Sequence, residues 1–111
     1  MLQVNCGNLL ETMSDYIAIN LSYKAYQKLL KQSHSEKKLL DLSFSNDQLF
    51  WLAYGTSMCH LPVPELNYSR FDHMMQSFRI VGPFRNSPHF SKDFRCELGS
   101  TMNPRNKCQI L

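Results

Sequence analysis

The sequence predicts a mainly α-helical fold, and three features of its 111 residues support this. The segment Leu9–Leu30 runs for 22 residues without Gly or Pro, which is enough for about six helical turns. A second apolar segment follows Ser43 and Ser45, and serine is a favourable helix cap. Near the end of the chain, Pro88 stands where proline is preferred at a helix start.

The long helix carries two acidic side chains on the face that it is expected to bury. Winding it at about 100° per residue aligns one set of side chains along the helix. That line consists of Glu11, Asp15, Ala18, Ser22 and Ala25. Its flanks are Leu10, Ile17 and Leu21 on one side and Ile19, Tyr23, Tyr26 and Leu30 on the other. The face expected to meet water holds Asn20, Lys24, Gln27 and Lys31. A buried carboxylate is costly unless it meets a cation, a metal or several donors, so Glu11 and Asp15 need partners.

A simpler explanation of the acidic pair stays open at this point. Asn8 followed by Glu11 fits a capping box, and acidic side chains in a first helical turn are favoured by the helix dipole. On this interpretation Glu11 and Asp15 stabilise the start of their own helix and face solvent. Periodicity alone does not separate the two explanations.

The other predicted elements are shorter. A second helix starts with Asn46-Asp47-Gln48 and is apolar on nearly all sides, so Phe50 and Trp51 are expected to pack in the core. Residues 78–86, FRIVGPFRN, are predicted to form a short extended Phe-Arg-Ile segment with a Gly-Pro turn. Asn86-Ser87-Pro88 then caps the first of two short C-terminal helices.

The composition narrows the possible functions. The chain has room for one domain with a modest core, and its formal net charge is +3. Lysine and arginine are scattered and do not alternate with aromatic residues, so no nucleic-acid partner is expected. No apolar run approaches roughly 18 residues, and the N-terminus lacks a charged start followed by an apolar core. We therefore expect no transmembrane segment and no signal peptide in these residues.

The four cysteines allow several interpretations. Cys6, Cys59, Cys96 and Cys108 show no CxxC spacing, so a zinc ribbon is not indicated. They allow two disulfides in any of three connectivities, or reduced thiols in a cytosolic protein. Cys108 also begins the closing residues CQIL, which fit a prenylation pattern, although no basic run precedes it.

Several motifs resemble the neprilysin and endothelin-converting-enzyme family of zinc metallopeptidases. The long helix resembles the family's ExxxD helix in Glu11–Asp15, Ala18 and Tyr23–Tyr26. DQLFWLAYGTSMC, residues 47–59, is similar to the family's DQLFF-type helix, and the tail from Phe90 to Cys108 resembles its closing FxxxFxC…GSxMNPxxKC string. The resemblance implies that residues 1–111 are the C-terminal part of a single, gluzincin-type catalytic domain.

The resemblance also implies roles for individual residues. Glu11 corresponds to the family's third zinc ligand, and Asp15 to the aspartate that orients a zinc-binding histidine. His73 and Arg79 correspond to residues that line the substrate cleft. There, a histidine donor and an arginine fork would hold the oxyanion and a substrate carbonyl during peptide hydrolysis.

The resemblance further implies a secreted setting. Cys59, Cys96 and Cys108 fall at family disulfide positions, where each pairs with a cysteine that precedes this segment, whereas Cys6 has no counterpart. An extracellular or plasma-membrane ectodomain is expected, attached to the membrane only through an N-terminal anchor missing here.

One required motif is absent from the sequence. A peptidase of this type needs HExxH, two histidines one helical turn apart with a glutamate base between them. None of the four histidines has that spacing; they are His34, His60, His73 and His89. We therefore expect a C-terminal fragment of a neprilysin-like zinc metalloendopeptidase, inactive and without stable zinc when alone. Its partners would be peptide substrates and the remainder of the catalytic domain. The alternative is a non-enzymatic, degenerate family member that acts as an interaction or peptide-binding protein.

Overall fold

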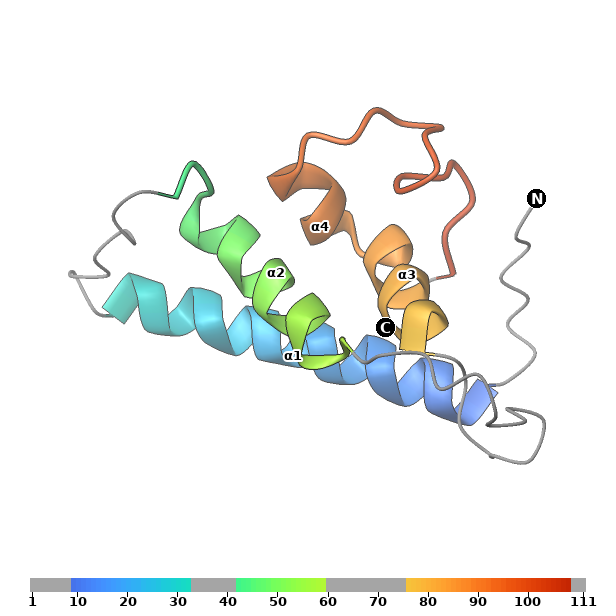
Figure 1. Ribbon diagram of the computed structural model, residues 1–111, viewed down its shortest axis with the longest axis horizontal. Helices are drawn as coiled ribbons and strands as arrows, with labels where there is room; N and C mark the ends of the chain where they lie inside the picture. Colours follow the sequence, from blue (N-terminus) through green and yellow to red (C-terminus); the bar gives the residue numbers. More distant parts are fainter. Residues whose placement is uncertain (1–8, 33–41, 60–75, 109–111) are drawn as a thin grey trace.

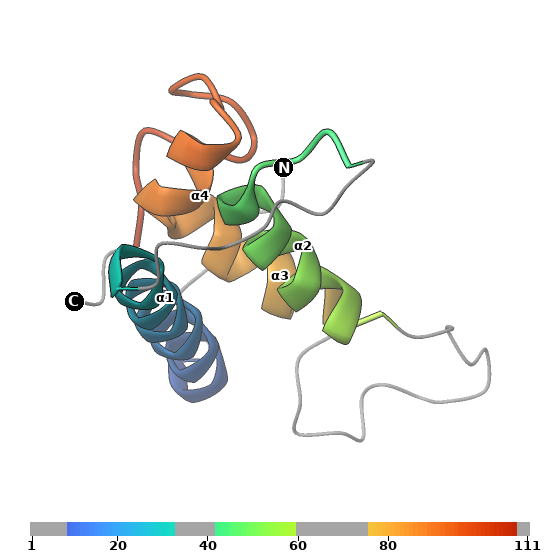
Figure 2. The ribbon, with the colours of Figure 1, turned by 90° about the vertical axis from the view of Figure 1, so that its left-hand side faces the viewer.

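The computed structural model describes residues 9–32, 42–59 and 76–108, together with the side chains of all but residues 9–12 and 76. These ranges form four helices, α1 (Leu9–Gln32), α2 (Asn46–Ser57), α3 (Gln76–Asn86) and α4 (Pro88–Asp93). The helix α1 forms one long side of the molecule, and the other three helices all lie on the same side of it (Figures 1 and 2). Within the described ranges there is no strand, so the predicted mainly α-helical class is confirmed.

The helix α1 has nearly the predicted bounds, but its buried face is rotated from the predicted one. The side chains that it buries are those of Asp15, Tyr16, Ile19 and Tyr23. Three small residues predicted to lie at the centre of the buried face are exposed: Ala18, Ser22 and Ala25. Leu21, predicted beside them, is also exposed. Aromatic side chains bury far more apolar area than alanine or serine, so the helix turns its tyrosines inward.

The face of α1 predicted to meet water is only partly solvated. Lys24 and Lys31 are exposed, as predicted, but Asn20 and Gln27 are half-buried. Asn20 donates from Nδ2 to the carbonyl of Tyr16 at 2.8 Å, and Gln27 donates from its amide to Asp47 of α2. The rotation therefore brings two amides into the interface, and hydrogen bonds compensate for their burial.

The helix α2 begins at the predicted cap. The Ser45 hydroxyl accepts from the Gln48 backbone N–H at 3.2 Å, and the Gln48 side chain accepts from the Ser45 N–H at 3.0 Å. This reciprocal pair is a capping box. Trp51 is fully buried, but Leu52 and Ala53 are exposed. The prediction of a helix buried on nearly all sides was wrong: α2 packs along one face.

The predicted extended segment is wrong, because these residues form the helix α3. It continues through residues 78–86, with Pro83 inside the helix. Proline lacks an N–H donor and crowds the carbonyl four residues earlier, so a helix was not expected here. Burial outweighs this cost, because Pro83 is fully buried and the Phe84 ring lies 5.2 Å from that of Trp51.

The helix α4 confirms the first predicted short C-terminal helix. Ser87 is its N-cap and Pro88 occupies its first turn. The second short helix is absent from the described tail, because residues 94–108 form turns and irregular structure. Gly99 in this tail has φ +98°, a conformation that side chains with a Cβ rarely adopt.

Aromatic side chains from all four helices make the core. Trp51 lies at its centre: Tyr23 of α1 stacks on it at 5.0 Å, and Phe84 and Phe90 meet it edge-on at 5.2 and 5.5 Å. Offset and edge-on aromatic pairs add stabilisation beyond the area they bury. None of the described helices has the length and apolar character that crossing a lipid bilayer requires.

Candidate functional site

A part-buried ion pair joins α1 to α3. Arg79 donates from Nε to Oδ2 of Asp15 and from Nη2 to Oδ1, both at 2.8 Å. The Asp15 side chain is 12% exposed and that of Arg79 28%. This is a bidentate ion pair, in which the planar guanidinium matches both carboxylate oxygens. The carboxylate predicted to point inward therefore meets a cation.

The local structure explains why these two residues meet. Asp15 lies in the second turn of α1, on the same face as Ile19 and Tyr23. Because these two side chains pack in the core, Asp15 also points inward. Arg79 lies in the first turn of α3, which packs against α1. Removing two charges from water is costly, but two charge-assisted hydrogen bonds compensate for much of it. The pair consequently fixes both side chains in one geometry.

Tyr54 of α2 lies close enough to the pair to sense both charges. Burial raises the pKa of its hydroxyl, the Asp15 charge raises it further, and the Arg79 charge lowers it. Tyr54 is half-buried. The sequence gives no signal for a role of Tyr54 here, because it lies in an apolar helix among other large side chains.

The other predicted site residues are placed only in part. Glu11 belongs to the first turn of α1, but its side chain lies outside the described residues, as does all of His73. Cys59 is exposed and Cys96 and Cys108 are half-buried, and none of the three forms a disulfide within the described residues. Their pairing with cysteines elsewhere stays a prediction.

The described residues offer no complete metal site. Among them, no three side chains of histidine, cysteine, aspartate or glutamate gather closely enough to hold an ion. The predicted zinc ligand Glu11 would supply one donor, whereas catalytic zinc usually has three protein ligands. Asp15 is engaged by Arg79 and fits a supporting role better than that of a ligand.

The described residues thus form a helical unit in which three helices pack on one long helix, and an Asp15–Arg79 ion pair joins α1 to α3. The sequence profile of Peptidase family M13 matches residues 4–110. The chain therefore belongs to this family, that of neprilysin and the endothelin-converting enzymes.

Individual relatives show the same similarity. Endothelin-converting enzyme 1 of Rattus norvegicus is 36% identical over 103 residues, which are 90% of this chain and 14% of that protein. Neprilysin of Homo sapiens has the same identity and coverage. The Kell blood group glycoprotein of Homo sapiens is 33% identical over 101 residues, 91% of this chain and 14% of that protein. The chain thus spans a small fraction of the length of these relatives.

Proposed function

We propose that these residues form the C-terminal part of the catalytic domain of a zinc metalloendopeptidase that cleaves peptide bonds. The observation that carries the proposal is the Asp15–Arg79 pair, at 2.8 Å in both hydrogen bonds. Resemblance assigns Asp15 to the support of a metal-binding histidine and Arg79 to substrate binding. Membership of Peptidase family M13 supports the same assignment.

The geometry of the pair suits both roles. Each carboxylate oxygen can accept more than one hydrogen bond, so Asp15 can receive an imidazole N–H while Arg79 holds it. Such an acceptor fixes the tautomer and orientation of a metal-binding histidine. The same contact fixes the guanidinium plane of Arg79, which limits the entropy lost when it donates to a peptide carbonyl. His73 would add a donor to the developing oxyanion.

The metal would be held only in part by this chain. Glu11 would supply one zinc ligand, and two histidines of an HExxH helix would come from the remainder of the catalytic domain. Zinc bound there would activate a water molecule for attack on the peptide bond. The extracellular setting and the disulfides of Cys59, Cys96 and Cys108 belong to the same proposal.

The first test compares the isolated 111-residue chain with an assembled catalytic domain. The purified 111-residue chain should bind no stoichiometric zinc and cleave no peptide, because it lacks HExxH. When it is joined to a catalytic-domain portion that carries HExxH, zinc content should approach one ion and chelator-sensitive cleavage should appear. Measurable chelator-sensitive cleavage by the 111-residue chain alone would contradict the proposed division of labour.

The second test assigns the residues within the assembled protein. Asp15→Asn keeps the shape of the side chain but weakens its hold on an imidazole, so zinc affinity should fall by about 10- to 100-fold. Arg79→Lys keeps the charge but loses the fork, so kcat/KM should fall with zinc content unchanged. Lys28→Gln, an exposed change on the same helix as Asp15, serves as the control and should alter neither quantity.

A non-enzymatic role as an interaction or peptide-binding protein is the second candidate. In such a protein the Asp15–Arg79 pair would hold α1 and α3 together without serving a metal. A peptide ligand would then bind without zinc and without being cleaved. Zinc-independent peptide binding by the 111-residue chain would favour this candidate over the peptidase.

A further inference from the structure

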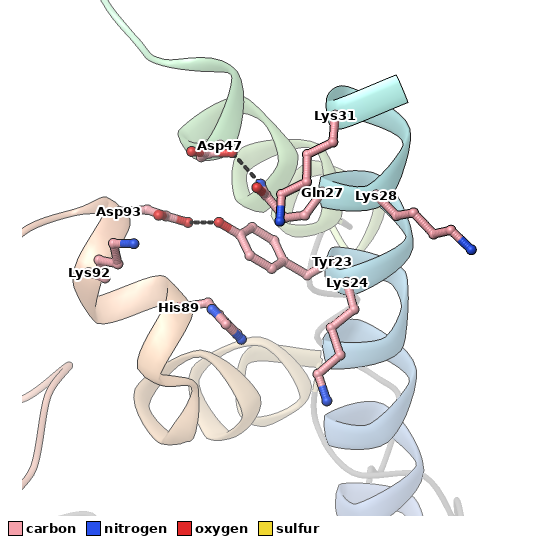
Figure 3. A pocket seen from close by; sticks show the side chains of 9 residues that line it. All are labelled: Tyr23, Lys24, Gln27, Lys28, Lys31, Asp47, His89, Lys92 and Asp93. Carbon is pink, nitrogen blue, oxygen red and sulfur yellow. Dashed lines mark hydrogen bonds between the residues drawn. The ribbon is translucent and has the colours of Figure 1, made fainter. Parts of the chain in front are cut away.

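A second group of charges lies toward the C-terminal end of α1, beyond the Asp15–Arg79 pair. Residues of α1, α2 and α4 enclose an open pocket of about 450 Å³ there (Figure 3). We call it the lysine pocket, after four of its lining residues: Lys24, Lys28 and Lys31 of α1 and Lys92 of α4. Its volume falls within the range of small-molecule sites.

The acidic residues of the lysine pocket are satisfied by neutral donors. Oδ2 of Asp93 accepts from the Tyr23 hydroxyl at 2.7 Å and from Nε1 of Trp51 at 2.8 Å, while Asp47 accepts from the amide of Gln27. In the part of the chain that the structure describes, no ion pair joins either carboxylate to a pocket lysine. Four lysines against two aspartates leave the lining with a net positive charge.

The side chains are arranged around one ring. Tyr23 lies at the centre of the view, with His89 stacked on it at 4.9 Å, and Lys31 and Lys92 approach from α1 and α4 (Figure 3). Lys28 points away from this group (Figure 3). The lysine pocket therefore has a rigid aromatic floor and cationic groups from two different helices. It shares no residue with the proposed peptidase site.

We propose that the lysine pocket binds a small oxyanion that carries several phosphate or sulfate groups. Ammonium groups act as compact point charges that accept tetrahedral anions from many directions, whereas carboxylate partners favour the arginine fork, and the described lining contains no arginine. Lys24 and Lys31 are seven residues apart on one face of α1, about 10 Å along its axis. With Lys92 opposite, this spacing suits an anion with separate charged groups better than a single phosphate ion.

Titration calorimetry on the full natural chain that carries these residues tests the proposal. The probes are tripolyphosphate, a highly sulfated tetrasaccharide and, as a carboxylate comparison, citrate. The double variant Lys31→Gln/Lys92→Gln should weaken binding of the phosphate or sulfate probe by about tenfold. The control Arg95→Gln/Arg105→Gln removes the same charge from exposed residues that do not line the pocket, and it should change the affinity by about twofold or less.

The probe that binds most tightly identifies the class of ligand. Preferential binding of tripolyphosphate supports a phosphate ligand, and preferential binding of the tetrasaccharide supports a sulfated one. Equal losses in the two double variants, equal affinity for citrate, or no binding by the folded wild-type chain would overturn the proposal. Circular dichroism verifies folding; should the pocket variant unfold, the exposed single change Lys92→Gln decides the matter, with an expected loss of about threefold.

Discussion

Asp15 and Asp93 are held in opposite ways, although each lies at a junction of helices. Asp15 faces a guanidinium, and both of its oxygens accept from a cation. Asp93 uses a single oxygen to accept from Tyr23 and Trp51, two neutral donors at 2.7 and 2.8 Å. The Asp15 contact therefore neutralises a charge, whereas the Asp93 contact leaves a negative charge beside the aromatic core.

The two aspartates therefore make two kinds of contact: an ion pair at Asp15 and neutral hydrogen bonds at Asp93. The Asp15–Arg79 pair links two helices and fixes the plane of the guanidinium, which we propose binds substrate. The Asp93 contacts link α1, α2 and α4 without using any cation, and the Gln48 side chain adds a donor to the Asp93 carbonyl at 3.0 Å. Neutral donors thus satisfy Asp93 without any ion pair to the nearby lysines in the described residues. The same residue type thus makes a charged pair at one place and neutral hydrogen bonds at the other.

The largest effect should follow from breaking the charged pair. Arg79→Met leaves Asp15 as a buried carboxylate without its cation, so the free energy of unfolding should fall by about 3 kcal/mol. Urea unfolding followed by circular dichroism measures it. The double variant Asp15→Leu/Arg79→Met removes both charges and should recover most of the loss. A double variant as unstable as Arg79→Met would show that lost packing, and not the unpaired charge, dominates.

Breaking the Asp93 contact should cost less. Tyr23→Phe removes one hydrogen bond to a carboxylate but leaves the donor of Trp51 in place, so we expect a loss of about 1.5 kcal/mol. Tyr16→Phe is the matched control: Tyr16 is also buried on α1, and no described hydrogen bond involves its hydroxyl. It should change stability by about 0.5 kcal/mol or less. Equal losses of unfolding free energy in the two variants would show that the hydrogen bond from Tyr23 to Asp93 does not stabilise the fold.

The two regions should also respond together to alkaline pH. Burial, the hydrogen bond to Asp93 and the charge of Asp93 raise the pKa of Tyr23 far above its ordinary value of 10.0. Burial likewise raises the pKa values of Tyr16 and Tyr54. Above pH 10 the unfolded chain releases these protons while the folded chain retains them, so the folded state loses stability as the pH rises.

The slope of the unfolding free energy against pH shows whether Tyr23 contributes to this loss. One tyrosine whose folded pKa stays above the measured range contributes about 1.4 kcal/mol per pH unit above pH 10. The stability of Tyr23→Phe should therefore fall less steeply than that of the wild type between pH 10 and 11. Identical slopes for the two proteins would contradict the raised pKa of Tyr23.

The sequence predicts helix positions better than it predicts which face each helix buries. Local signals set the start of α2, because Ser45 and Gln48 carry the whole capping box within four residues. The same holds for Ser87 and Pro88 at α4. The buried face of α1 depends instead on where Trp51 and Phe84 come to lie, which no local pattern contains. The helical state of Pro83 likewise depends on burial by distant residues.

The candidate site shows the same limit. An inward carboxylate at Asp15 follows from helical periodicity, but Arg79 as its partner lies 64 residues away and was singled out only through family resemblance. The lysines of the pocket are separated by up to 68 positions, from Lys24 to Lys92, so they look scattered along the chain. Tertiary folding, and not sequence proximity, brings both groups of charges together.

The smallest effect should come from the cap of α2 and should again separate the two regions. Ser45→Ala removes the acceptor for the Gln48 N–H, and losing such a cap costs about 1 kcal/mol. Because Gln48 also donates to the Asp93 carbonyl, fraying of the first turn of α2 should loosen the Asp93 contacts before it reaches the Asp15–Arg79 pair. Hydrogen exchange should therefore quicken at the Trp51 indole N–H while the Arg79 Nε–H stays protected. Equal acceleration at the two groups would mean that α2 and the charged pair unfold as one unit.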